Sequence, residues 1–310
     1  MGKIAFVFPG QGAQSVGMGY EAYNGSDAAK VVYDMFNKVL DRNLTKVCFE
    51  GPDEDLKITT NTQPAILATS IALLEALKTK TDIKADYLCG HSLGEYAALY
   101  EAGVLSLEDT IKAIGKRAEL MGKSKGGAMA AVLGLDDAKV KEITTGISSE
   151  AYVDVANYNC PGQVVITGTQ EGIDKASALL SEAGAKRVLP LAVSGAFHSE
   201  MMKEAGLAFA EFVSELAIND AKTPVVTNVD AKETTSSSAF KTKMPEQIYS
   251  SVYWTQTVQY LESQGVDTIL EIGPGKVLAG LIKKISPSIK VTNITDLKSI
   301  DAFVESLQEA

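Results

Sequence analysis

The sequence has 310 residues, of which 45% are hydrophobic and 22% charged, so it can bury a sizeable core in one large domain or two. Its net charge of −10 disfavours nucleic acid or an anionic membrane as the main partner, because both require a basic surface on the protein. The three cysteines, Cys48, Cys89 and Cys160, are far apart and odd in number, which argues against a disulfide framework and a cysteine zinc site.

The first predicted element is a buried strand, KIAFVF at residues 3–8, which ends in the glycine-rich loop PGQGAQ. Proline and glycine interrupt this apolar segment too soon for a signal peptide, and no run of about 18 apolar residues occurs in the chain. We therefore expect a cytoplasmic protein with reduced cysteines and no membrane-spanning segment.

Two further segments combine a strand, a sharp turn and a helix. ADYLCG at 85–90 precedes HSLGEYAALYEAG, a predicted helix that ends at Gly103, and VDTILEIGPGKVLAGLIKKI at 266–285 follows the same pattern. Strands that alternate with helices predict a mainly parallel sheet covered on both faces. The turn IGPGK lacks the spacing of a phosphate-binding loop, so we interpret it as structural.

Residues 90–94, GHSLG, fit the G-x-S-x-G nucleophile elbow in the strand–turn–helix setting that this motif requires. A turn that exposes Ser92 brings the strand and helix backbones close together, and side chains at Gly90 and Gly94 would collide there. The following helix directs free N–H groups and its positive dipole end toward the serine. The alternative is a chance match in a tight turn, which the setting disfavours.

A serine hydroxyl needs a neighbouring base to act as a nucleophile. The sequence contains only two histidines, His91 and His198. His91 directly precedes Ser92, in a turn that points adjacent side chains in different directions, so His198 is the predicted base by elimination. A structural role for this histidine is the alternative.

The loop FPGQGAQ places Gln11 between Gly10 and Gly12, at the end of a strand that we expect to neighbour the elbow strand. An oxyanion hole requires a second donor besides the N–H that follows the nucleophile. The backbone N–H groups of Gln11 and Leu93 would form a workable pair. A plain turn is the alternative.

A further predicted helix begins after Ser106, its expected N-cap. Its apolar stripe runs through Ile111, Ile114, Ala118 and Met121. At about 100° per residue, Arg117 lies nearer to this stripe than to the charged face of the helix. A guanidinium beside apolar surface calls for an anion, and its fork suits a carboxylate. An arginine that reaches solvent from the edge of the stripe is the alternative.

Between residues 125 and 193 the pattern changes to the order strand–helix–strand–strand–helix–strand, which is the ferredoxin-like split unit. The predicted strands are 127–134, 151–158, 163–169 and 185–193, and the predicted helices are 136–146 and 171–184. We expect residues 125–193 to form a small subdomain that is inserted into a larger one of residues 1–124 and 194–310.

Two polar segments are predicted to have no catalytic or binding role. The hairpin NYNCPGQ contains Asn157, Asn159 and Gln163, for which turn formation alone is the favoured interpretation. Residues 230–243, DAKETTSSSAFKTK, are rich in serine and threonine and are predicted to form an exposed loop.

Six segments together resemble the malonyl-CoA:acyl carrier protein transacylases of bacterial fatty acid synthesis: FPGQGAQ, TQPAI, GHSLGEYAAL, ANYNCPGQVVITG, GAFHSEMM and EIGPGKVLAGL. The resemblance runs almost end to end. It implies an α/β fold in which a hydrolase-like, mainly parallel sheet subdomain contains an inserted ferredoxin-like (βαββαβ) subdomain. It also implies a ping-pong reaction, without a metal or organic cofactor, that moves malonyl from coenzyme A to the phosphopantetheine thiol of acyl carrier protein through a malonyl-serine ester.

The resemblance also implies roles for single residues. Ser92 matches the family nucleophile, His198 its base, and Arg117 the partner of the malonyl carboxylate. Gln11 and Leu93 match the family residues whose backbone N–H groups bind the oxyanion. Gln247 matches the residue whose main-chain carbonyl orients the histidine, in place of the acid of a triad.

Phe197 and Met121 are the remaining residues that we expect to bind substrate. In related polyketide acyltransferases, a phenylalanine directly before the histidine goes with selection of malonyl over methylmalonyl. Gly195 departs from the malonyl version of that four-residue pattern, which commonly begins with histidine, and this departure predicts a looser selectivity.

Two other functions stay open. A serine esterase or thioesterase of the α/β-hydrolase type would use an Asp or Glu between Ser92 and His198, where the sequence has many acidic residues. A binding or scaffold protein on the same fold would form no acyl-serine.

The expected partners are acyl carrier protein and a coenzyme A thioester, and we expect a monomer that serves fatty acid rather than polyketide synthesis, since no linkers are apparent. The carrier protein of this family is acidic, and this chain carries a charge of −10. Docking therefore requires a local basic patch. We predict it near Lys116, Lys123, Lys125, Lys186 and Arg187.

Overall fold

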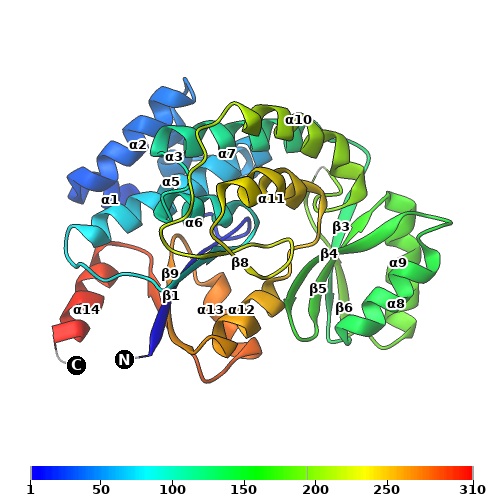
Figure 1. The fold of residues 1–310 in the computed structure, drawn as a ribbon. Coiled ribbons are helices and arrows are strands. Elements are labelled where there is room, and N and C mark those ends of the chain that lie inside the picture. Colours follow the sequence, from blue (N-terminus) through cyan, green and yellow to red (C-terminus); the bar gives the residue numbers. More distant parts are fainter. Residues whose placement is uncertain (1, 194, 309–310) are drawn as a thin grey trace.

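The computed structural model describes residues 2–193 and 195–308, which form a main body and a smaller lobe (Figure 1). The strands are β1 (Lys3–Phe8), β2 (Tyr87–Gly90), β3 (Ala128–Leu133), β4 (Val153–Cys160), β5 (Gln163–Gly168), β6 (Arg187–Pro190), β7 (Val225–Val226), β8 (Glu233–Thr234), β9 (Val266–Ile272) and β10 (Lys290–Ile294). They form a six-stranded sheet of order β10-β9-β1-β2-β7-β8 and a four-stranded sheet of order β4-β5-β3-β6.

Helices cover both sheets. The chain also forms two short 3-10 turns, η1 (Ser92–Gly94) and η2 (Glu200–Met202). The helices are α1 (Tyr20–Gly25), α2 (Asp27–Val39), α3 (Leu44–Glu50), α4 (Asp53–Lys57), α5 (Thr59–Lys78), α6 (Glu95–Glu101), α7 (Leu107–Gly122), α8 (Asp137–Ile147), α9 (Gln170–Glu182), α10 (Lys203–Ser214), α11 (Ser237–Tyr249), α12 (Trp254–Ser263), α13 (Val277–Ile285) and α14 (Leu297–Gln308).

The six-stranded sheet is mainly parallel, as the sequence predicts. β1 lies between β2 and β9 and is parallel to both, and only β8 runs antiparallel to its neighbour. Phe8 at the end of β1 pairs with Gly90 at the end of β2. The loops that follow these two strands, which contain Gln11 and Ser92, therefore leave the same edge of the sheet.

The alternation of side chains along β1 explains why both faces of this sheet are covered. Phe6 and Phe8 belong to one apolar core, with α2, α5, α7 and α10, whereas Ala5 and Val7 belong to a second core, with α12 and α13. Figure 1 shows these two sets of helices on opposite sides of the sheet. The central helix α5 is buried nearly all around, which explains its lack of a polar face.

The four-stranded sheet is antiparallel and has the strand order of a ferredoxin-like unit. Helices α8 and α9 pack on one of its faces around Ala130, Val132 and Val164. Met129 and Ala131 point to the other face, where the main body lies. The predicted range 125–193 contains this whole sheet, and the predicted return of the chain at Ser194 falls outside the described residues.

Strand β4 attaches the lobe to the main body. The N–H of Tyr158 donates to the carbonyl of Val252 at 2.9 Å, and the N–H of Val252 donates to the carbonyl of Ala156 at 2.8 Å. The hydroxyl of Ser251 donates to the carbonyl of Val155 at 2.6 Å. The segment before α12 is thus held against the lobe by backbone bonds that a sequence pattern does not reveal.

The prediction of an exposed loop over residues 230–243 is wrong for two parts of that range. β8 occupies residues 233–234 and α11 begins at Ser237, with Phe240 fully buried. The serine- and threonine-rich composition favours a loop, but Phe240 and Met244 pack into the apolar core beside α10 and stabilise a helix. The last strand of the lobe is also shorter than predicted, since β6 ends at Pro190.

The cysteines Cys48, Cys89 and Cys160 are buried and free. Over the described ranges 2–193 and 195–308, no helix combines the length and the apolar character needed to cross a membrane. Within the same ranges, no three His, Cys, Asp or Glu side chains gather as a metal-binding group.

Candidate active site

Ser92 lies at the tip of a tight turn between β2 and η1, with a φ of 51° in the left-handed region. A Cβ at Gly90 would lie 2.0 Å from the carbonyl carbon of Gly94, and a Cβ at Gly94 would lie 2.2 Å from the carbonyl oxygen of Phe8. The two glycines of the GHSLG motif are therefore required by backbone contacts on both sides of the turn, as the sequence predicts.

His198 faces this serine. Its Nε2 lies 2.9 Å from the Ser92 Oγ, and its Nδ1 lies 2.8 Å from the carbonyl oxygen of Gln247 and 3.2 Å from that of Ser250. A carbonyl oxygen only accepts, so the proton of the neutral ring is on Nδ1 and Nε2 is free to accept from the serine hydroxyl. This is the tautomer that a general base requires.

The surroundings of His198 keep the ring neutral. The side chain is buried, and burial together with the nearby Arg117 charge lowers the pKa of His198 to about 3. The backbone carbonyls of Gln247 and Ser250 act in the opposite direction but more weakly. The residue is also held with a φ of 57°, a strained conformation that persists only where packing enforces it.

Arg117 lies on α7, whose N-cap is Ser106 as predicted, and its side chain is only 1% exposed. Its guanidinium donates to the Gln63 Oε1 at 2.5 Å, and to the Ser92 Oγ and the Gln247 Oε1 at 3.0 Å each. The Nε has no hydrogen-bond partner among the described residues, and the guanidinium lies 5.7 Å from the centre of the Tyr96 ring. These partners are neutral, so a full positive charge is held beside the serine without a contacting carboxylate.

A cavity of about 270 Å³ opens in front of Ser92, between the main body and the lobe. Seven of the predicted site residues line it: Gln11, Ser92, Leu93, Arg117, Met121, Phe197 and His198. The eighth, Gln247, is buried behind the serine, where its Nε2 donates to the Ser92 carbonyl oxygen at 3.1 Å. The lobe contributes Met129 and Ala131 from β3 to the same cavity.

The hairpin of the lobe also reaches the site, so the interpretation of its polar residues as turn formation alone is wrong. Asn157, Asn159 and Gln163 all line the cavity. The Asn159 Oδ1 lies 2.8 Å from the Nε2 of His91, which packs beside the ring of Trp254. His91 therefore faces the lobe, whereas the Ser92 hydroxyl faces His198.

Sequence reasoning missed three residues of the site: Gln63, Asn228 and Ser250. Gln63 also donates to the Met121 sulfur at 3.4 Å. A signal for it existed, because a glutamine within an otherwise apolar helix calls for a buried partner. Asn228 bonds to Ser92 from a turn 136 residues away, and no local pattern indicates that contact.

A nucleophile elbow that faces an imidazole, on a mainly parallel α/β sheet, defines a serine acyl-transfer protein. The model of the acyl transferase domain family matches residues 5–300. A malonyl CoA-acyl carrier protein transacylase of Bacillus subtilis (strain 168) is 45% identical, with 100% of this chain and 98% of that protein aligned. The chain therefore belongs to the acyl transferase domain family and, within it, to the malonyl CoA-acyl carrier protein transacylases.

Solved structures agree with this assignment. An acyl-carrier-protein S-malonyltransferase from Burkholderia pseudomallei 1710b superposes with a TM-score of 0.94 and 38% identity, covering 98% of this chain and 99% of that one. A malonyl-transacylase in complex with a type II PKS acyl-carrier protein superposes with a TM-score of 0.95 and 36% identity, with the same coverage. These neighbours share the two-subdomain architecture described above.

Proposed function

We propose that this protein transfers a malonyl group from malonyl-CoA to the phosphopantetheine thiol of acyl carrier protein through an ester on Ser92. In the first half-reaction the Ser92 Oγ attacks the thioester carbonyl while His198 Nε2 takes the hydroxyl proton. The carbon–sulfur bond then breaks, and the proton on His198 passes to the departing coenzyme A thiolate. The backbone N–H groups of Gln11 and Leu93 are the proposed donors to the developing oxyanion.

The second half-reaction reverses these steps with a different thiol. The thiol of the carrier protein gives its proton to His198 and attacks the malonyl ester. The bond to Ser92 breaks, and the proton returns from His198 to the serine oxygen. The carbonyls of Gln247 and Ser250 accept from the Nδ1–H of His198 and hold the ring in one orientation, whether Nε2 carries a proton or not. The proposed reaction uses two thioester substrates and no metal or organic cofactor.

One observation carries the choice of a malonyl substrate: the buried guanidinium of Arg117, 3.0 Å from the Ser92 Oγ. Its contacts are amide and hydroxyl oxygens, and its Nε–H has no acceptor within the described part of the chain. A carboxylate bound there would form charge-assisted bonds that the resting site lacks. The free carboxylate of malonyl is this group, and acetyl has no equivalent.

A hydrolase is the rival function, and the geometry argues against it. An α/β-hydrolase orients its histidine with an Asp or Glu, whereas the Nδ1 of His198 meets two backbone carbonyls. The imidazolium formed during reaction therefore lacks the direct carboxylate contact of a triad. A scaffold protein without activity is a second rival, which the test below separates.

The test is intact mass spectrometry after brief exposure to malonyl-CoA, with Ser92→Ala as the control. We expect one malonyl group on the wild type and none on the variant. Addition of acyl carrier protein should discharge this ester onto the carrier within seconds. Rapid release of free malonate without carrier would identify a hydrolase, and the absence of any ester would contradict catalysis altogether.

We further propose that the enzyme acts as a monomer in the cytoplasm and supplies fatty acid synthesis. Three buried, free cysteines suit a reducing compartment. Gel filtration with light scattering measures the oligomeric state directly. Transfer assays with carrier proteins of fatty acid and polyketide pathways would rank the two acceptors.

A further inference from the structure

The left-handed backbone of Ser92 needs a source of support. A non-glycine residue with φ near 51° costs about 1–3 kcal/mol unless its surroundings hold it there. Gly90 and Gly94 remove the steric obstacles to the turn, but they do not favour it over other conformations. The bonds that hold the turn must come from elsewhere in the fold.

Asn228 provides these bonds. Its Oδ1 accepts the N–H of Ser92 at 2.7 Å, and its Nδ2 donates to the carbonyl oxygen of Gly90 at 2.7 Å. One planar amide therefore spans the elbow and bonds the residues at positions 90 and 92. The side chain is fully buried, so water does not compete for either bond.

The backbone of Asn228 is fixed by two further bonds. Its N–H donates to the Oε2 of Glu95 at 2.7 Å, and its carbonyl oxygen accepts the N–H of Tyr253 at 3.1 Å. Glu95 is itself buried at the start of α6, immediately after the elbow, and burial raises the pKa of its carboxyl group to about 7. The turn after β7 is thus joined to both sides of the nucleophile.

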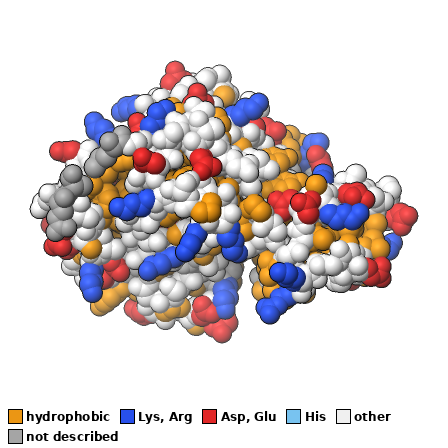
Figure 2. Space-filling view, turned by 90° about the horizontal axis from the view of Figure 1, so that it is seen from below, with side chains coloured by type: hydrophobic (Ala, Val, Ile, Leu, Met, Phe, Trp, Pro, Cys, Tyr) orange, Lys and Arg blue, Asp and Glu red, His pale blue; other side chains and the backbone are white. Residues whose placement is uncertain are grey.

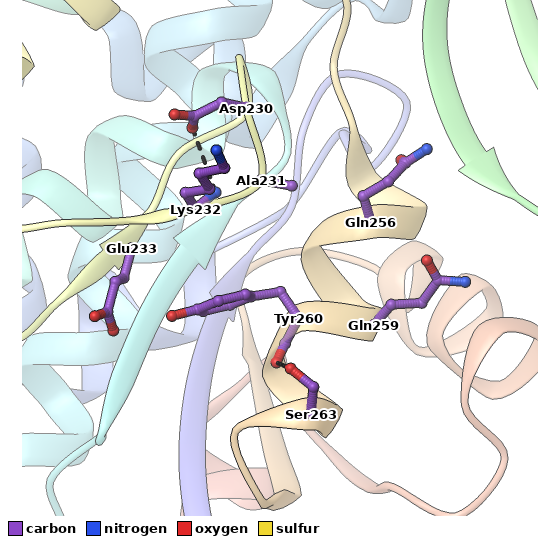
Figure 3. Close-up of a pocket in the computed structure, with 8 residues that line it drawn as sticks. All are labelled: Asp230, Ala231, Lys232, Glu233, Gln256, Gln259, Tyr260 and Ser263. Atoms are coloured by element: carbon purple, nitrogen blue, oxygen red, sulfur yellow. Dashed lines mark hydrogen bonds between the residues drawn. The ribbon is translucent and has the colours of Figure 1, made fainter.

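The turn that carries Asn228 is held by hydrogen bonds of its own. The N–H of Thr227 donates to the carbonyl of Lys232 at 3.1 Å, and the N–H of Ala231 donates to the carbonyl of Thr227 at 2.9 Å. Lys243 donates to Asp230 at 2.8 Å. Figure 3 shows the outer side of this turn, where Asp230, Ala231 and Lys232 border a surface hollow. Asn228 does not border this hollow and is fully buried.

We infer that Asn228 is a positioning residue that holds Ser92 in its reactive left-handed conformation through the paired bonds to Ser92 N–H and Gly90 C=O. This inference rests on the proposed role of Ser92 as nucleophile. Only a group with one donor and one acceptor at amide spacing satisfies both contacts. An ionised aspartate has no proton for Gly90, and alanine leaves both backbone groups unpaired.

The expected defect lies in the chemical step. The Ser92 Oγ is placed 2.9 Å from His198 Nε2 and 3.0 Å from Arg117, and a displaced backbone would misalign it with both. A misplacement of about 1 Å costs about 100-fold in rate. Asn228→Ala should therefore lower the single-turnover rate of ester formation about 100-fold and leave KM for malonyl-CoA little changed.

Asn228→Asp tests the same bonds within one folded protein. A protonated aspartate has an O–H to donate to Gly90 and an oxygen to accept from Ser92, so it imitates the amide. The ionisable groups near this position are Glu95 of α6, Arg117 of α7, Lys243 of α11 and His198. Wild type measured over the same pH series accounts for their titration, and His198 stays neutral across it.

The experiment follows malonyl-Ser92 formation by rapid-quench mass spectrometry between pH 8 and pH 5 for wild type, the two Asn228 variants and Lys232→Ala. Lys232 is exposed on the same turn, so its variant should match wild type. Asn228→Asp should be slow at pH 8 and recover toward wild type as the pH falls. A profile parallel to that of wild type, or an Asn228→Ala rate equal to wild type, would overturn the positioning role alone. A wild type that forms no ester would overturn the proposed function as well.

Discussion

The guanidinium of Arg117 is a buried charge whose hydrogen-bond partners among the described residues are all neutral. Burial is the largest influence on it and lowers its pKa, while Tyr96 and Glu95 favour the charged form. Such an arrangement stabilises the resting protein poorly, because desolvation of the ion is not offset by a direct ion pair. It suits a site that gains its counter-charge only when substrate binds.

Removing this charge should change substrate preference. Loss of one member of a buried ion pair costs about 2–5 kcal/mol, or roughly 30- to several-thousand-fold in kcat/KM. Arg117→Ala is therefore expected to lose malonyl loading by this factor, while acetyl loading falls little or rises. Competition between malonyl-CoA and acetyl-CoA, scored by the mass on Ser92, measures both. An equal loss for the two substrates would indicate structural damage.

The pH dependence of loading reports on His198. A protonated imidazole cannot accept the serine proton, so activity is lost as the pH falls through the pKa of this ring. An ordinary histidine, with a pKa near 6.5, would lose about 30-fold in rate between pH 7.5 and pH 5. With the pKa of His198 lowered to about 3, kcat/KM for malonyl-CoA should stay nearly constant over that range.

Two variants control this profile. His198→Ala should lower kcat by several orders of magnitude, as the loss of a base in a catalytic unit does. His91→Ala should cost far less, because His91 bonds to Asn159 rather than to the serine. A steep acid limb near pH 6.5 in the wild type would contradict the neutral, buried environment of His198.

Phe197 lines the cavity directly before His198, and its Cε1 would lie 3.0 Å from a Cβ added at Gly195. One methyl group in a hydrophobic pocket is worth about 1–3 kcal/mol, which sets malonyl selectivity over methylmalonyl at roughly 10–200-fold. Phe197→Ser should narrow this ratio, mainly through faster methylmalonyl loading. The measurement is competition between the two CoA esters. An unchanged ratio would show that the ring does not limit the space beside the α-carbon.

At the level of secondary-structure elements, the strand–turn–helix formed by β2, η1 and α6 leaves no space for a side chain at Gly94. A Cβ at Gly94 would meet the backbone oxygens of Phe8 and Pro9 at 2.2 and 2.7 Å, and a main chain cannot rotate away as a flexible side chain does. Gly146 on α8 offers a matched comparison, since a Cβ there would meet nothing within 4 Å.

These two glycines should respond in opposite directions. Gly94→Ala is expected to lower the free energy of unfolding by about 3 kcal/mol or more, because overpacking forces the backbone apart. Gly146→Ala should raise it by about 0.5–1 kcal/mol, because alanine restricts the unfolded chain and favours the helix. Urea unfolding followed by circular dichroism measures both. An equal change in the free energy of unfolding for the two variants would mean that the backbone near Gly94 moves away from β1 at no energetic cost.

For the molecule as a whole, the net charge of −10 opposes the approach of an acidic carrier protein. Seen from below, the molecule has a notch between the main body and the lobe, with Lys and Arg side chains on both sides (Figure 2). Lys284 of α13 lies 3.5 Å from Gln163, a cavity-lining residue of the lobe. Basic groups near the cavity therefore come from both parts of the structure.

Within the predicted docking patch, the structure distinguishes two kinds of residue. Lys116 and Lys123 both pair with Glu119 on α7, which reduces their attraction for a partner. Lys186 directly precedes the edge strand β6 and Arg187 begins it, and Arg187 lies across Leu133 from Gln163 in the register of the sheet. We therefore expect these two residues to contribute more to docking.

Charge reversal tests this expectation. Arg187→Glu should slow transfer to acyl carrier protein and weaken its salt dependence, while malonyl loading of Ser92 stays intact. Lys30→Glu makes the same change in charge on the exposed face of α2, far from the lobe in Figure 1, and should leave transfer unchanged. The measurement is the rate of discharge from malonyl-Ser92 at several salt concentrations. Equal effects of the two variants would indicate that only total charge matters.

Local patterns in the sequence determined much of this protein. The spacing of apolar residues predicted β1, β2, β9, α7 and the order of elements in the lobe. Burial of one face of a helix or strand requires apolar residues at a fixed spacing, whatever the position of that element in the fold. The GHSLG motif identified the elbow, since close backbone contacts admit only glycine at its two ends. The stripe on α7 placed Arg117 off the charged face of the helix, and the structure decided that it is buried rather than reaching solvent.

Only the tertiary structure decided which groups meet at the serine. Arg117 bonds to Gln63, 54 residues before it, and to Gln247, 130 residues after it, while Asn228 reaches Ser92 across 136 residues. The two-residue strand β7 and the helix at 237–249 likewise follow from packing that local sequence patterns do not indicate. A helix or strand with one buried face produces a regular repeat of apolar residues in the sequence. A single hydrogen bond between distant segments produces no such repeat, so only the fold decides these contacts.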